Sequence, residues 1–407
     1  MTSSRAIDSA APGITAPAGN RPASITLRHL GGADLTDTDI AAWLELESRA
    51  LEPNAYLSPL FVVPALRHLG LDKRTSVTFL EENRGSGKIV QAVAVLQSSS
   101  PDRTLPMPHR RAFLSTYSFL SGILVARDDP RRHLRALCKG LDGRFGHGLV
   151  IESCRVDGPT DSLLRAIAHE TGMRRSESYR YQRATMIPRE MGEAYLTGPL
   201  SSRNKKLRSQ KNKLGKQGEV RFEVLRGPAI DDAAIERHLA LEHMGWKGES
   251  GTSMRSNPAH EAFFRDVAAG FAADDRALFA QLSVGDHVIA STSNFIAGKT
   301  GFAFKIGFDP AYSQFGPGTM CELEFMRCAP DIAGDLDSFD SGAVAGSYLE
   351  AMWPERDAIA TVAYSTSLAG NLAMACNTQL RRIKQMVSKR TSRAPTAPAP
   401  ATQTADE

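Results

Sequence analysis

Short apolar runs separated by glycine-containing turns dominate the second half of the chain. Three such runs follow one another closely, at residues 277–284, 287–297 and 300–308. They are linked by Gly285-Asp286 and Gly298-Lys299, and two-residue links that contain glycine are typical of β-hairpins. The pattern therefore predicts an antiparallel meander of three strands. The next segment, 319–329, is apolar nearly all round, which predicts a buried helix directly after the meander.

The spacing of apolar positions predicts further elements along the whole chain. Helices are expected over residues 39–51, 131–141, 161–170, 201–218, 231–244 and 259–273. Strands are expected over residues 75–81, 88–97, 148–152, 220–225, 338–341 and 358–364. Both halves share a rough order of helix, hairpin, helix and short strand, which is compatible with an internal duplication.

The length of 407 residues exceeds one ordinary hydrophobic core, so two globular regions are expected. We place them at residues 25–190 and 219–388, joined by a basic connecting helix within 191–218. The ends, 1–24 and 389–407, are rich in small residues and proline, so both are expected to be disordered.

Composition narrows the class of protein. Hydrophobic residues make up 42% and charged residues 23%, which fits a globular protein, and no run approaches the ~20 apolar residues of a membrane helix. The five cysteines are scattered without a CxxC motif, which favours free thiols in a reducing compartment and a cytoplasmic location. The ten histidines show no metal-binding spacing, so we expect no metal.

Positive charge is concentrated in one segment, although the net charge is only +4. Residues 203–216 carry seven basic side chains and no acidic one. One interpretation is a solvated helix face. The other is contact with a polyanion such as a CoA phosphate, a phospholipid or lipid-linked sugar, or RNA, although a nucleic acid is not expected as the main partner.

A glycine-rich segment lies between the third strand of the meander and the buried helix. It reads Phe308-Asp309-Pro310-Ala311-Tyr312-Ser313-Gln314-Phe315-Gly316-Pro317-Gly318-Thr319. A loop that opens a helix presents unpaired N–H groups at the positive end of the helix dipole, where a phosphate or diphosphate binds well. Dinucleotide folds instead alternate parallel strands with helices. A meander of strands that feeds such a loop is one way in which an acyl-CoA site can be built.

Three groups of motifs carry a resemblance to a known family. The first is Gly245-Trp246-Lys247-Gly248 with Gly251-Thr252, after a helix that contains Glu242. The second is Gly307-Phe308-Asp309-Pro310 with Tyr312 and Gly316-Pro317-Gly318, and the third is Phe339-Asp340 followed by Tyr348 and Trp353. They resemble the BioF2-like, or CelD-like, acetyltransferase domain of the GNAT superfamily, which is related to Fem-type transferases with two GNAT-like lobes. The resemblance covers about residues 203–382. The first half resembles a partner lobe only loosely, through Trp43 and Ser58-Pro59-Leu60-Phe61.

The resemblance implies an α/β (α+β) fold of two GNAT-like lobes, each with a mixed, largely antiparallel sheet flanked by helices. Acetyl-CoA or another acyl-CoA would lie between two diverging parallel strands. Its diphosphate would rest on a loop formed by Gln314, Phe315, Gly316, Gly318 and Thr319. Relatives often have a basic residue where Ser313 and Gln314 stand, and often have Lys where this chain has Leu349.

Acyl transfer to an amine needs a base, because an ammonium cannot attack a thioester. Glu242 is the candidate base, with a surface residue as the alternative interpretation. Tyr348 is the candidate acid for the departing CoA thiolate. Asp340 beside it is a catalytic candidate or else a buried hydrogen-bond partner. Trp246 and Lys247 are expected to bind the acceptor substrate.

These residues together predict an acyl-CoA-dependent N- or O-acyltransferase. The acceptor would be an amine or hydroxyl of a sugar, a lipid precursor or another small metabolite. No cysteine or serine lies in a known nucleophile motif, which favours direct transfer. Two alternatives stay open: a Fem-type transferase that uses aminoacyl-tRNA, and a non-catalytic GNAT-like binding protein.

Overall fold

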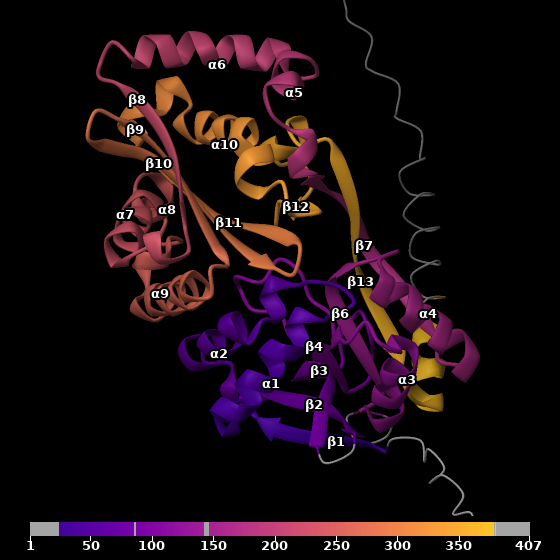
Figure 1. Ribbon diagram of the computed structural model, residues 1–407. Coiled ribbons are helices and arrows are strands. Elements are labelled where there is room, and N and C mark those ends of the chain that lie inside the picture. Colours follow the sequence, from indigo (N-terminus) through magenta and orange to yellow (C-terminus); the bar gives the residue numbers. More distant parts are fainter. Residues whose placement is uncertain (1–23, 85–86, 142–145, 378, 380–407) are drawn as a thin grey trace, which may run out of the picture.

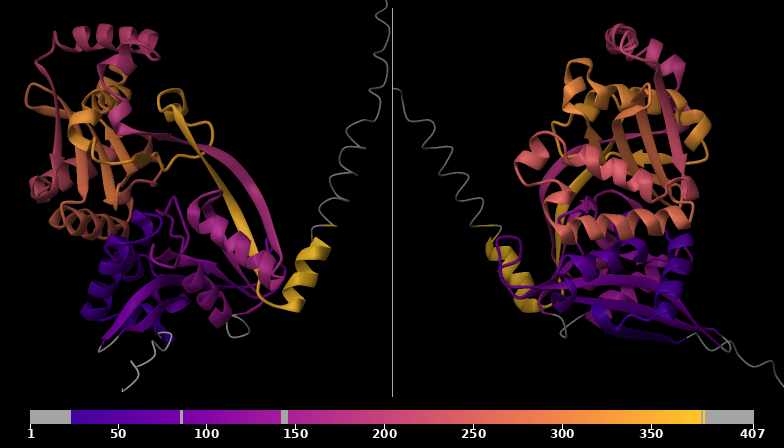
Figure 2. Two further views of the ribbon diagram at one scale, coloured as in Figure 1. Left: turned by 45° about the vertical axis from the view of Figure 1, so that its right-hand side comes forward. Right: turned by 90° about the vertical axis from the view of Figure 1, so that its left-hand side faces the viewer.

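A computed structural model describes residues 24–84, 87–141, 146–377 and 379. Apart from Ser24, both segments expected to be disordered lie outside the described residues. Figure 1 and Figure 2 show two lobes, connected by a long pair of curved strands.

One continuous sheet runs through both lobes, in the order β1-β2-β3-β4-β6-β13-β7-β12-β11-β10-β9-β8, with β5 beside β3. The strands of the first half are β1 (Ile25–Gly31), β2 (Thr75–Arg84), β3 (Gly87–Ser99), β4 (His109–Ala112), β5 (Leu124–Val125), β6 (Gly148–Arg155) and β7 (Arg175–Met186). Those of the second half are β8 (Val220–Arg226), β9 (Ala277–Val284), β10 (His287–Ala297), β11 (Thr300–Phe308), β12 (Ser338–Asp340) and β13 (Glu355–Ser365). The predicted mixed, mostly antiparallel α/β fold is confirmed.

Helices cover both faces of the sheet in each lobe. They are α1 (Asp37–Ser48), α2 (Pro59–His68), α3 (Pro130–Leu141), α4 (Pro159–Thr171), α5 (Glu193–Thr197), α6 (Ser201–Leu214), α7 (Asp232–His243), α8 (Trp246–Glu249), α9 (Pro258–Ala273) and α10 (Pro317–Ala333). In the second lobe α7 and α9 pack on one face and α10 packs on the other. None of the helices that the structure describes is long and apolar enough to cross a membrane.

The two long strands β7 and β13 belong to both lobes. β13 pairs with β6 of the first lobe, and β7 pairs with β12 of the second. The two strands also pair with each other in antiparallel fashion, from Glu355 opposite Thr185 to Tyr364 opposite Arg175. The predicted domain limits at residues 190 and 219 lie on either side of α5 and α6, while the sheet continues across them.

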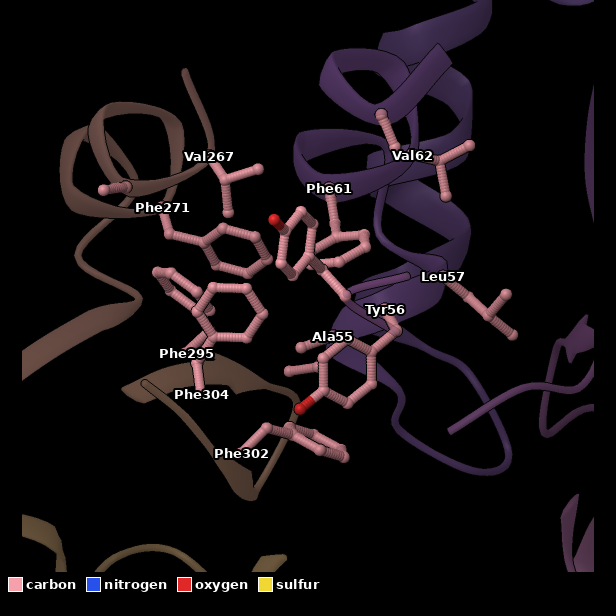
Figure 3. Packing of buried hydrophobic residues seen from close by; sticks show 14 of the residues in the cluster. Ala55, Tyr56, Leu57, Phe61, Val62, Val267, Phe271, Phe295, Phe302 and Phe304 are labelled. Carbon is pink, nitrogen blue, oxygen red and sulfur yellow. The ribbon is translucent and has the colours of Figure 1, made fainter. Parts of the chain in front are cut away.

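An aromatic core joins the lobes where α2 faces α9. Figure 3 shows Tyr56 and Phe61 of the first lobe directed toward Phe302 and Phe304 of β11. The rings of Tyr56 and Phe302 are 5.7 Å apart and nearly perpendicular, as aromatic pairs prefer. The Tyr56 hydroxyl also donates to the Ala303 carbonyl at 3.3 Å. The first lobe therefore packs directly against the strand that carries the proposed site.

The predicted meander is confirmed, and its last strand contains an irregularity. The register between β10 and β11 shifts between Ser293 and Asn294, which leaves Phe304 as an extra residue on β11. A β-bulge of this kind bends a strand and redirects its side chains.

Candidate active site

Two parallel strands separate beside the glycine-rich loop. β11 and β12 pair only over Thr300–Phe302 and Ser338–Asp340. β12 then ends, and the Ser341 N–H donates to Ala184 of β7 at 3.2 Å. β11 continues to Phe308, so its edge from Ala303 onward has no partner strand among the described residues. We call this opening the wedge.

The backbone of Ile306 faces the wedge. The Lys305 N–H donates to Ser293 Oγ at 3.3 Å, so the polar backbone groups of Lys305 face β10. Because these groups alternate in direction along a strand, those of Ile306 face the open edge. Consistent with this, Lys247 Nζ donates to the Ile306 carbonyl at 2.8 Å. The Ile306 N–H is therefore directed into the wedge.

The glycine-rich segment forms a 3-10 turn, η7 (Pro310–Phe315), and then α10. Gly316 adopts the left-handed conformation with φ of 65°, and α10 starts at Pro317 without a side-chain cap. Since Pro317 has no N–H, Gly318 and Thr319 supply the first free N–H groups of the helix. Gln314 is exposed, whereas the Phe315 side chain is buried in the core and leaves only its backbone for a ligand. No basic side chain lies within this segment.

Glu242 and Lys247 lie on the opposite side of β11 from α10. Glu242 lies in the last turn of α7 and is 1% exposed, so it is not a surface residue. Its Oε2 accepts the Met254 N–H at 2.9 Å, and Lys247 Nζ lies 3.5 Å from Oε1. Lys247 thus contacts both the carboxylate and the wedge edge of β11. Trp246 is the first residue of α8, and its side chain lies outside the described part of the structure.

Lys305 and Tyr117 join this group from β11 and from the first lobe. Lys305 Nζ lies 4.7 Å from the centre of the Tyr117 ring, and the Tyr117 hydroxyl is 2.8 Å from His260 Nδ1. Burial lowers the pKa of Lys305 to about 8 and that of nearby His238 to about 3. The sequence analysis did not find Tyr117 or His260, and no motif marks them.

Asp340 is at the base of the wedge in a buried ionic network. Its carboxylate accepts the Gly342 N–H at 2.7 Å and lies 3.2 Å from Arg155 and 3.4 Å from Arg183. Arg183 also donates to the carbonyls of Ala343 and Phe119. Asp340 and Arg183 are each 1% exposed. The network connects β12 to β6, β7 and the loop after β4.

Tyr348 is the first residue of the 3-10 turn η8 (Tyr348–Ala351), and its side chain is 44% exposed. The rest of its surface packs against the protein, and this partial burial, with Glu322 and Cys321 of α10 nearby, raises its pKa. Glu322 itself is buried and accepts the Trp353 indole N–H at 2.8 Å. Burial raises the pKa of Glu322 to about 7. The structure thus places Tyr348 beside Glu322 of α10. Nothing in the sequence indicated Glu322 as a site residue.

The corresponding opening of the first lobe is closed by the chain itself. β4 and β6 are also parallel neighbours that pair only briefly. The Ser121 N–H, however, donates to Ser153 at 3.1 Å, and the Ser121 hydroxyl donates to Phe113 at 2.8 Å. Asp128 and Asp129 precede α3, and their charge disfavours an anion at that helix start. Among the described residues, the first lobe therefore does not repeat the open strand edge of the second lobe.

The described residues contain no cluster of three or more His, Cys, Asp or Glu that could hold a metal.

Comparison with known families supports the class of enzyme. Residues 201–348 match a family model described as the acetyltransferase (GNAT) domain. This stretch begins with α6 and ends at Tyr348, so it contains the wedge, the glycine-rich loop, Glu242 and Lys247. The predicted class, an acyltransferase, is confirmed. No curated protein sequence matches the chain significantly.

Solved structures support the two-lobe fold. FemX is similar with a TM-score of 0.53 and 11% identity, covering 86% of this chain and 100% of FemX. A DUF2156 domain from Agrobacterium fabrum, described as the C-terminal part of a lysylphosphatidylglycerol synthetase, is similar with a TM-score of 0.51 and 14% identity. That match covers 83% of this chain and 94% of that domain. At such identities the likeness concerns the fold.

Proposed function

We propose that this protein is an acyl-CoA-dependent acyltransferase of the BioF2-like or CelD-like type that acts in the cytoplasm. The acyl group would pass directly from CoA to an amine or hydroxyl of a sugar, a lipid precursor or another small metabolite. The observation that carries the proposal is the separation of β11 from β12 beside the free N–H groups of Gly318 and Thr319. A thioester can lie along the open edge of β11 with its diphosphate at the start of α10.

The residues around the wedge suggest how transfer would proceed. The Ile306 N–H would polarise the thioester carbonyl. Glu242 would accept the proton of the attacking amine or hydroxyl, directly or through water. Tyr348 would donate its phenolic proton to the departing CoA thiolate. Lys247 and Trp246 would position the acceptor.

For Asp340 we propose a positioning role. Its carboxylate already accepts the Gly342 N–H and is next to two arginines. Both of its oxygens face an arginine, which holds the carboxylate within the network of Arg155 and Arg183. Asp340 would thus fix the end of β12, where the wedge opens.

A second candidate is transfer from an aminoacyl-tRNA. The feature that favours it is α6, whose cations are mostly exposed. Among the described residues, the only ion pair of an α6 cation is Lys211 with Glu324, at 2.8 Å. Such a helix can contact RNA as well as the phosphates of CoA.

Titration calorimetry with acetyl-CoA, free CoA and tRNA tests the proposal. We expect both coenzyme forms to bind, and tRNA to bind weakly. A Cβ at Gly318 would lie 3.1 Å from Ile306 Cδ1, so Gly318→Val should both crowd the loop and cover its N–H groups. It should weaken CoA binding about tenfold or more.

Gly87→Val is the matched control, because a Cβ at Gly87 meets nothing within 4 Å and lies far from the wedge. Equal CoA affinity of Gly318→Val and the wild type would place the coenzyme elsewhere. Tight, salt-sensitive tRNA binding without CoA binding would favour the second candidate. CoA binding without transfer to any acceptor would favour a non-catalytic binding protein.

A further inference from the structure

We infer that the acceptor carries an anionic group, a carboxylate or a phosphate, and that Lys305 binds this group where the two lobes meet. The inference rests on the proposed function, and it names the class of acceptor substrate.

The charges beside the wedge do not balance. Lys247 and Lys305 contribute two ammonium groups, and Glu242 contributes one carboxylate. That carboxylate is already shared by Lys247, 3.5 Å away, and the Met254 N–H. Among the described residues no carboxylate lies within ion-pair distance of Lys305. One positive charge is left without a counter-ion.

Lys305 is held in place by aromatic rings. Its Nζ lies 4.7 Å from the Tyr117 ring centre and 5.7 Å from that of Phe304. The bulge at Phe304 bends β11 next to Lys305. The Lys305 N–H donates to Ser293 Oγ and so fixes the backbone there. Cation–π contacts offset only part of the cost of removing an ammonium group from water. A ligand anion would supply the rest.

The wall around Lys305 comes from both lobes. Tyr117 belongs to the first lobe and stacks on Phe263 of α9, with ring centres 5.4 Å apart. His260 of α9 fixes the Tyr117 hydroxyl. The other titratable groups that influence Lys305 are Glu242 and Lys247, and His238 of α7 is close enough for Lys305 to influence it in turn. Only one of these groups carries a negative charge, so the surroundings favour an anion over a cation.

Lys305 stays mostly protonated near neutrality. Its pKa of about 8 leaves roughly nine molecules in ten charged at pH 7. An anion bound at this ammonium group would stabilise the charged form and raise the pKa again.

NMR of the full-length protein tests the inference without an identified acceptor. Lysines are labelled by reductive methylation with ¹³C-formaldehyde, and the Lys305 signal is assigned by its absence in Lys305→Met. Inorganic phosphate and acetate are added in turn at constant ionic strength. We expect the Lys305 signal to shift along a saturable curve with at least one anion and its apparent pKa to rise. A Lys305 signal that responds to neither anion would overturn the inference.

Thermal unfolding provides a second readout. Phosphate or acetate should raise the Tm of Lys305→Met less than that of the wild type, of Lys305→Arg and of the exposed control Lys73→Met, because the start of α10 stays available to anions in all four proteins. An equal rise in Lys305→Met would show that the anion binds elsewhere. Neither experiment contains a coenzyme. A failure to bind acetyl-CoA would therefore overturn the proposed function without changing the interpretation of the Lys305 result.

Discussion

Glu322 is a buried carboxylate on α10, the helix that packs its apolar side chains into the core of the second lobe. It is 7% exposed and accepts one hydrogen bond, from Trp353. Its pKa of about 7 means that the folded protein holds a proton that the unfolded chain releases near pH 4.5. Between these two pH values the folded state binds more protons, so rising pH removes stability across this window.

Glu322→Gln should remove this pH dependence. The amide stays neutral and keeps an oxygen that can accept from Trp353. The variant should match the wild type near pH 4.5 and exceed its free energy of unfolding by about 3 kcal/mol at pH 8. Urea unfolding at pH 5 and pH 8 measures the difference. The exposed Glu249→Gln is the control, and a pH-independent difference would show that Glu322 is charged when folded.

Only some of the site residues could be identified from the sequence. Glu242, Lys247 and Tyr348 belong to local motifs, which makes them visible in one sequence. Tyr117 reaches Lys305 only because α2 and the loop after β4 pack against α9 and β11. Its neighbours in sequence give no sign of that contact. The direction of Lys305 depends on the bulge at Phe304, and an unbroken apolar pattern does not reveal a bulge.

At the scale of elements, α7 packs unusually close to β11. A Cβ on Gly307 would lie 2.3 Å from the Glu242 backbone nitrogen and 2.5 Å from the Leu241 carbonyl carbon. These are backbone atoms, so the helix would have to move away from the strand. The glycine thus sets the position of Glu242 beside the wedge.

Gly307→Ala should lower the free energy of unfolding by about 3 kcal/mol and weaken any ligand binding that depends on Glu242. Gly270→Ala is the matched control. It lies within helix α9, and its Cβ would meet Leu60 at an ordinary 3.6 Å. Alanine there should be neutral or stabilising. Chemical denaturation of both variants measures the effect, and equal stability would mean that α7 can shift freely.

The basic helix α6 lies beside the glycine-rich loop, which has no cation of its own. Gln210 Nε2 donates to the Gln314 carbonyl at 3.3 Å. Lys206 and Lys213 share this helix face, being four residues before and three after Gln210. Figure 1 shows α6 running along the outer side of α10. These lysines can supply the positive charge that relatives carry in the loop.

Lys206→Gln with Lys213→Gln should weaken CoA binding about fivefold at low salt and reduce its salt dependence. Lys205→Gln with Arg208→Gln changes the same net charge on the other faces of α6 and should have a smaller effect. Calorimetry at two salt concentrations provides the comparison. Equal losses in both pairs would indicate a general charge effect.

Strands and helices were predicted correctly where the buried positions follow the hydrophobic pattern of the sequence. β9, β10 and β11 have the predicted limits because glycine-containing turns separate them at Gly285-Asp286 and Gly298-Lys299. β7 (Arg175–Met186) was not predicted. It carries Arg175, Arg180 and Arg183 among few apolar residues, and its first eight residues are only half-buried or exposed. A strand with few buried positions has no regular alternation of apolar and polar residues from which it could be predicted.

At the scale of the molecule, the lobes are joined by shared strands and by buried charges. Arg183 has Asp340 as its ion-pair partner among the described residues, whereas Arg155 also lies 2.9 Å from Asp357. The network reaches β6, β7 and β12. No feature of the sequence shows that β13 pairs with β6 of the first lobe, because the apolar pattern of β13 would suit any neighbouring strand.

Asp340→Asn should leave the buried Arg183 without a counter-charge and cost about 3 kcal/mol or more. Because the sheet is continuous, scanning calorimetry should show one transition that moves as a whole to lower temperature. Asp357→Asn, at a more exposed position, should cost less. Unchanged stability together with lost transfer activity would instead support a chemical role for Asp340.

The pairing of β13 with β6 also matters while the protein is being synthesised. The first lobe obtains its neighbour for β6 only when Glu355–Ser365 has left the ribosome. Until then an unpaired edge is exposed on a half-finished product, a state prone to aggregation. Chaperones that shield nascent chains should therefore raise the yield of this protein more than that of a single-lobed relative.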